Sequence, residues 1–110
     1  MKLPNGDRAV VELAKLRDYC LNKQHFRGRH KARVFASALG ITSEDAEILR
    51  QTLLDAAVEK GATLGEQDDY GQRYVLDFRM TGPRGSATVR SLWIVLTCEK
   101  VPRLLTRYVL

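Results

Sequence analysis

A basic run in the N-terminal half of the chain carries residue types that could act on RNA. Residues 19–43 include both histidines and five lysines or arginines, and no aspartate or glutamate. RNA cleavage without a metal needs a base for the 2′-hydroxyl proton, a cation for the charge that develops at phosphorus, and an acid for the departing 5′-oxygen. Histidine suits the first and last of these tasks because imidazole titrates near neutral pH. The run therefore predicts a phosphate-binding site that could cleave RNA.

Two residues of this run have distinct expected positions. His25 precedes a helix in a loop, where it can be aimed at a substrate, and it is the best candidate for the acid or the base. Lys31 lies four residues before Phe35, on the apolar stripe of that helix, so its ammonium should project past the core edge toward a sheet. We expect Lys31 or an arginine of the sheet to hold the phosphate, and Thr106 or Tyr108 to position or relay a proton.

Other bases and one tyrosine are expected to bind the substrate. Arg29 and Arg33 fall on the outer face of the helix, where ordinary solubility explains them at least as well as attraction of a substrate. A surface role would also explain a lone histidine, but two histidines beside Lys31 make the functional interpretation equally good. The expected substrate-binding residues are Arg29, His30, Arg73, Arg90, Arg107 and Tyr108.

Three helices must position the N-terminal part of this site. Apolar residues recur at steps of three and four over residues 10–21, 28–39 and 42–60, which is the helical period. Gly40 is a good C-terminal residue for the second helix. Thr42 followed by Asp45 resembles a capping box and predicts the start of the third helix.

Strands follow the helices. From residue 72 the period changes to two, which predicts strands over 72–80, 86–97 and 103–110, with 62–68 as a possible edge strand. The predicted fold is α+β, with two to three N-terminal helices packed on one face of a three- to four-stranded antiparallel sheet.

The alternation within the strands predicts a basic open face, with two ambiguities. If the helices cover the face that bears Tyr74, the opposite face displays Arg73, and Arg90 should join it. A bulge in the continuously apolar middle strand would change the side that Arg90 takes. In the last strand, Thr106 and Arg107 cannot both face the same layer if the strand is regular.

Composition limits the remaining possibilities. At 110 residues, we expect one domain over residues 1–110, and a net charge of +5 favours an anionic partner such as RNA. Residues 44–69 carry eight acids against two bases, which indicates a second, acidic surface. The sequence has no apolar stretch of about 18 residues and no signal-peptide pattern, so we expect a cytoplasmic protein without a membrane partner. The chemistry above calls for no metal and no cofactor.

Seven stretches carry a pattern that extends over nearly the whole chain: 15–22, 25–28, 31–35, 39–40, 70–71, 93–95 and 102–108. This pattern resembles a small bacterial family of domains of unknown function that recurs beside toxin modules. It also resembles, at superfamily level, the barnase, EndoU, colicin and RelE (BECR) group of metal-independent toxin ribonucleases, which place helices before an antiparallel sheet.

The resemblance implies a function and a set of site residues. It implies a BECR-like domain that acts as a toxin-like endoribonuclease and leaves a 2′,3′-cyclic phosphate, with His25, Lys31 and Thr106 in the site and Tyr108 nearby. Phe26 departs from the pattern, which has proline after the histidine. Toxins of this kind usually have a small neutralising, antitoxin-like partner, which here would be acidic and would cover the basic site.

Two other interpretations remain open from the sequence. The chain could be a non-catalytic RNA- or DNA-binding module, although exposed aromatic residues for base stacking are few. It could also be a protein-interaction domain whose basic surface docks an acidic partner. Cleavage of RNA would support the ribonuclease, and binding of RNA without cleavage would support the module. The absence of both would leave the protein-interaction domain.

Overall fold

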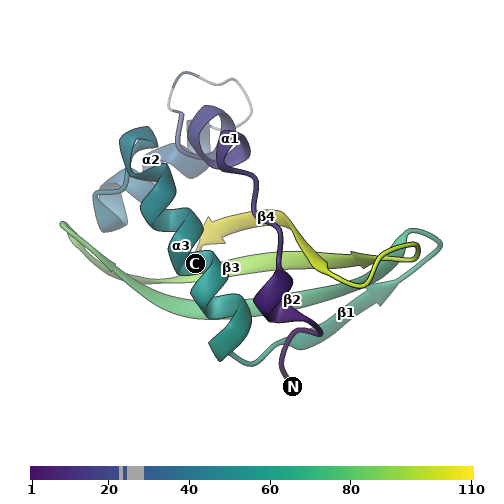
Figure 1. The fold of residues 1–110 in the computed structure, drawn as a ribbon. Helices are drawn as coiled ribbons and strands as arrows, with labels where there is room; N and C mark the ends of the chain where they lie inside the picture. Colours follow the sequence, from purple (N-terminus) through teal and green to yellow (C-terminus); the bar gives the residue numbers. More distant parts are fainter. Residues whose placement is uncertain (23, 25–28) are drawn as a thin grey trace.

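Helices come first in the fold and a four-stranded antiparallel sheet follows, as predicted (Figure 1). The structure is a computed structural model that describes residues 1–22, 24 and 29–110. Two short 3-10 helices, η1 and η3, and one π-helix, η2, accompany the α-helices. The elements are η1 (Gly6–Arg8), α1 (Leu13–Lys15), η2 (Leu16–Cys20), α2 (Arg29–Leu39), η3 (Ser43–Asp45), α3 (Ala46–Glu59), β1 (Thr63–Gln67), β2 (Gly71–Gly82), β3 (Gly85–Leu96) and β4 (Pro102–Val109).

The second and third predicted helices are confirmed with their signals. Gly40 follows α2 with φ of 74°, the left-handed conformation that glycine adopts without steric cost. The backbone N–H of Thr42 donates to the Asp45 carboxylate at 3.0 Å. Thr42 and Asp45 therefore form the predicted capping box at the start of η3. These ends fix the length of α2 and the entry into α3.

The first predicted helix is shorter than its apolar period indicated. Val10 is not helical, because its N–H donates to the Pro102 carbonyl at 2.9 Å and its carbonyl accepts from the Leu104 N–H at 3.0 Å. Val10 therefore pairs in parallel with the start of β4. Helical structure begins at Leu13 and widens at Leu16–Cys20, where the Leu21 N–H donates to the Leu16 carbonyl at 2.9 Å.

The sheet has the order β1-β2-β3-β4, so β1 and β4 are its edges. The possible edge strand near 62–68 is confirmed as β1. β2 and β3 form a long hairpin that pairs continuously from Gly71 with Leu96 to Gly82 with Gly85. The tip of this hairpin meets the end of α2, where the Arg84 N–H donates to the Leu39 carbonyl at 3.2 Å.

The core lies between the helices and one face of the sheet. Tyr74 and Leu76 of β2 and Trp93 of β3 are buried on this face, together with Phe35 of α2. The face predicted to lie under the helices is therefore confirmed. No helix in the described part of the chain combines the length and the apolar character that crossing a bilayer requires.

β4 contains a bulge that the alternation did not predict. Leu92 of β3 pairs with Thr106, but the next residue, Trp93, pairs with Leu104. Leu105 is thus one extra residue in β4 without a cross-strand partner. The sequence left room for a bulge in the middle strand, whereas β2 and β3 pair without interruption.

The bulge inverts the alternation of the residues that follow it. Leu104 lies opposite Trp93 on the helix-covered face, whereas Thr106 lies opposite Leu92 on the open face. Arg107 lies opposite Ser91 and returns to the helix-covered face. Leu104 and Thr106, which would share one side of a regular strand, therefore lie on opposite faces of the sheet.

Candidate functional site

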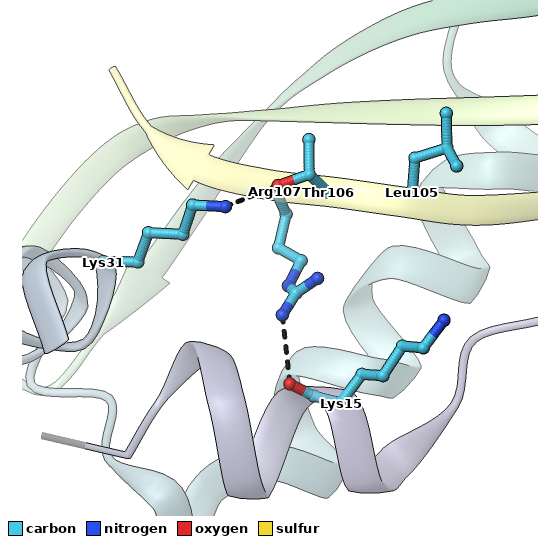
Figure 2. Close-up of a pocket in the computed structure, with 5 residues that line it drawn as sticks. All are labelled: Lys15, Lys31, Leu105, Thr106 and Arg107. Atoms are coloured by element: carbon cyan, nitrogen blue, oxygen red, sulfur yellow. Dashed lines mark hydrogen bonds between the residues drawn. The ribbon is translucent and has the colours of Figure 1, made fainter. Parts of the chain in front are cut away.

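A pocket of about 410 Å³ opens between the N-terminal helices and the edge strand β4 (Figure 2). Lys15 comes from α1, Lys31 from α2, and three consecutive residues come from the bulged part of β4. Of the described residues that line it, three are cations and none is acidic. The lining residues are Lys15, Lys31, Leu105, Thr106 and Arg107.

Lys31 and Thr106 meet directly in this pocket. The Lys31 Nζ donates to the Thr106 Oγ1 at 2.6 Å, in a partly buried position. The helical phase predicted that Lys31 projects toward the sheet, because Phe35, one turn later, packs in the core. The contact joins two residues 75 positions apart in the sequence.

Arg107 places a buried cation beside this contact. Its side chain points from β4 toward α1 (Figure 2), where Nη2 donates to the Lys15 carbonyl at 3.0 Å. The residue is 3% exposed, and its Nε is buried without a hydrogen-bond partner among the described residues. A buried polar group that lacks a partner is costly, so this nitrogen is an unusual feature of the fold.

The charge of Lys15 is only weakly compensated. Its Nζ lies 3.8 Å from the Glu12 carboxylate, and both side chains are more than half exposed. Exposed pairs at this distance are screened by water and contribute little. The pocket therefore combines an exposed lysine, a partly buried lysine and a buried arginine, which makes it electropositive.

The open face of the sheet is different, because both of its arginines that were expected to bind substrate have acidic partners. Arg90 donates to both oxygens of Asp77, each at 2.9 Å, and Arg73 donates to Asp68 at 2.7 Å. The hydrogen bond from Arg90 lowers the pKa of the Asp77 carboxyl below its ordinary value. The bond from Arg73 has the same effect on the pKa of Asp68. The predicted basic sheet surface is thus largely neutralised.

The structure brings together only some of the residues expected in the site. Lys31, Thr106 and Arg107 line one pocket, whereas Arg73 and Arg90 do not contribute to it. The other residues expected in the site do not line this pocket in the described part of the chain. Tyr108 is opposite Arg90 on the open face, Arg29 and His30 are exposed at the start of α2, and His25 lies outside the described residues.

Two lining residues were missed by the sequence interpretation. Lys15 lies in one of the stretches that carry the family resemblance, but its position in the sequence did not indicate a function for it. Leu105 looks like an ordinary strand residue, and only the bulge brings it to the pocket. Among the described residues, no three His, Cys, Asp or Glu side chains come together as a possible metal site.

Comparison with known proteins gives a family and a fold. A family model described as "Domain of unknown function (DUF6883)" matches residues 2–110. No curated protein matches the chain. A chain in the solved structure of a contact-dependent growth inhibition toxin and immunity protein complex from Klebsiella pneumoniae 342 is similar, with 15% sequence identity and a TM-score of 0.66. The match covers 93% of this chain and 98% of that chain, and at this identity it shows a shared fold.

Proposed function

Since the chain belongs to the DUF6883 family of domains of unknown function, we propose its activity from the site itself. We propose that it is a toxin-like endoribonuclease that cleaves RNA without a metal and leaves a 2′,3′-cyclic phosphate. The observation that carries the proposal is the Lys31–Thr106 contact at 2.6 Å in a pocket whose described lining has three cations and no acid. A phosphodiester is an anion that three such cations attract.

The residues divide the reaction among them. The 2′-oxygen attacks phosphorus, its proton passes to a base, and the bond to the 5′-oxygen breaks as that oxygen takes up a proton. Lys31 exchanges its contact with Thr106 for a non-bridging phosphate oxygen, and the Thr106 hydroxyl donates to the same phosphate. Arg107 adds a fixed positive charge next to them. His25, chosen from the sequence, serves as the acid or the base, and a water molecule exchanges the other proton.

The toxin part of the proposal has separate support. The similar chain of known structure comes from a complex between a toxin and its immunity protein. A toxin needs a neutralising partner in the cell that makes it, and a partner with an acidic surface would complement this pocket. We therefore include a small acidic neutralising protein among the expected partners.

Cleavage of RNA in the presence of EDTA tests the activity. Purified protein should cut total RNA or tRNA into fragments that end in a 2′,3′-cyclic phosphate. His25→Ala should lower the rate about 100- to 10,000-fold, the usual contribution of a general acid or base. Lys31→Gln should lower it about 100- to 1,000-fold, as loss of a group that stabilises transition-state charge does.

Controls separate the chemistry from folding and from net charge. Lys60→Gln removes the charge of an exposed lysine that does not line the pocket, so its rate should equal that of the unchanged protein. Circular dichroism should show that all variants are folded. Binding of RNA without any cleavage would instead support the non-catalytic module, and fragments that persist in His25→Ala would remove His25 from the mechanism.

A further inference from the structure

Leu105 is the single apolar side chain among the described residues that line the cationic pocket. It is 42% exposed, although β4 as a whole packs against the core. A leucine on a surface is ordinary, but one that forms part of a charged pocket adds an apolar wall to it. The ligand of this pocket should therefore have an apolar part beside its anionic part.

Sheet packing does not account for Leu105. The pairs on either side of it, Leu92 with Thr106 and Trp93 with Leu104, would join into a regular ladder if Leu105 were removed. It has no cross-strand partner and does not belong to the buried core. Bulges often stand next to functional sites, where they re-aim a side chain.

The bulge also determines what lies next to Leu105. Figure 2 shows the Leu105 and Thr106 side chains projecting on the same side of β4, with Arg107 on the other side. Adjacent residues of a regular strand would point to opposite faces. A ligand phosphate bound between Lys31 and Thr106 thus has Leu105 one residue away, about 3.8 Å along the backbone.

We propose that Leu105 forms a nucleobase subsite of this pocket and gives it a preference for purines. The proposal rests on the proposed function only in placing a nucleotide phosphate at Lys31 and Thr106. Leucine has no hydrogen-bonding group in its side chain, so it distinguishes bases by apolar contact area. A purine presents a larger flat face than a pyrimidine and gains more from the contact.

Binding of the four nucleoside 3′-monophosphates tests the subsite without requiring catalysis. Isothermal titration should show AMP and GMP binding about threefold more tightly than CMP and UMP, and all four more tightly than inorganic phosphate. Leu105→Ala should weaken purine binding about fivefold, the effect of losing a modest apolar contact, and reduce the purine preference. Leu64→Ala is the matched control, because Leu64 is also an exposed leucine, 57% exposed on β1, and does not line the pocket.

The outcomes separate this inference from the proposed activity. Purine-selective binding that depends on Leu105 supports the subsite even if no RNA is cleaved, and the ribonuclease proposal would then fail alone. Equal binding of all four nucleotides, or the same preference in Leu105→Ala, overturns the subsite whether or not RNA is cleaved. Binding no tighter than that of inorganic phosphate also overturns it.

Discussion

Arg107 is unusual because its charged side chain is almost completely buried. A guanidinium withdrawn from water loses favourable hydration, and its Nε has no partner among the described residues. Its Nη2 bond to the Lys15 carbonyl replaces part of that hydration. A structural role in holding β4 against α1 would explain this bond, but a neutral side chain could fill the same space. We therefore expect the charge itself to serve an anion in the adjoining pocket, which the bond to Lys15 does not explain.

Arg107→Met distinguishes a structural role of Arg107 from a role of its charge in binding an anion. Loss of a hydrogen bond to a charged group costs about 1.5–3 kcal/mol, whereas replacement of buried ionic groups by apolar side chains of similar volume is often neutral or stabilising by about 1–4 kcal/mol. We expect the free energy of unfolding in urea to change by no more than about 1 kcal/mol. Affinity for inorganic phosphate should fall about tenfold, as loss of one charge-assisted contact would produce.

The same substitution at an exposed arginine provides the comparison. Arg79→Met alters an exposed residue of β2 outside the pocket and should leave phosphate affinity unchanged. A loss of stability above about 3 kcal/mol in Arg107→Met, with phosphate affinity retained, would show that the role of Arg107 is structural.

At the scale of elements, the bulged part of β4 supplies three of the residues that line the pocket. The bulge adds Leu105 to the strand and places Thr106 and Arg107 on opposite faces at a free edge, so that all three line one pocket around this edge. Val10 occupies the edge of β4 as far as Leu104, and the bulge follows directly. The N-terminal segment thus ends its pairing where the pocket begins and continues into α1, which carries Lys15.

Deletion of Leu105 should leave the fold intact and remove the apolar wall of the pocket. Because the pairs on both sides join into a regular ladder, we expect the free energy of unfolding to change by less than about 1 kcal/mol. Purine nucleotides should bind about as weakly as they do to Leu105→Ala. Urea denaturation and calorimetry measure the two quantities.

Deletion of Leu92 is the comparison, because that residue lies within β3 and has cross-strand partners on both sides, Val75 and Thr106. Its loss shifts the register of part of β3 by one residue and moves apolar side chains to the other face, so this variant should be strongly destabilised. If deletion of Leu105 destabilises the protein as much as deletion of Leu92, the fold requires the bulge.

Local signals in the sequence were sufficient for most elements. The helical period, the Thr42–Asp45 pair and Gly40 fixed α2 and the start of the third helix, and the change of period at residue 72 fixed β2. The shift at Val10 was not visible, because its partner in β4 lies more than 90 residues away. Such pairing depends on tertiary structure and overrides local periodicity.

The candidate site was predictable only where local spacing or the family resemblance indicated the position of a residue. Lys31 followed from its place one turn before Phe35, and the resemblance indicated Thr106. Leu105 could not be recognised, because a strand of alternating pattern reads equally well with or without one extra residue. The acidic partners of Arg73 and Arg90 were likewise out of reach, since Asp77 and Arg90 are 13 residues apart and meet only across the hairpin.

Over the described residues, three arginines of the open face stand in ion pairs with acidic side chains, whereas the cations of the pocket share a lining that has no acidic member. On the open face, Arg73, Arg90 and Arg103 are paired with Asp68, Asp77 and Glu99. In the pocket, the described lining has no acid beside Lys15, Lys31 and Arg107. We therefore expect a nucleic acid to gain more from the pocket than from the open face, although the open face carries more arginines than the pocket carries cations.

The salt dependence of RNA binding distinguishes these surfaces. A 2′-O-methyl RNA oligonucleotide binds without being cleaved, and each cation that contacts a phosphate contributes about 0.7 to the slope of log K against log salt concentration. Lys31→Gln should therefore reduce the slope, measured by fluorescence anisotropy, by about 0.7. The double variant Asp77→Asn with Arg90→Gln keeps the net charge and should leave both slope and affinity unchanged. A reduced slope in the double variant, with none in Lys31→Gln, would assign RNA binding to the open sheet face and remove the pocket from it.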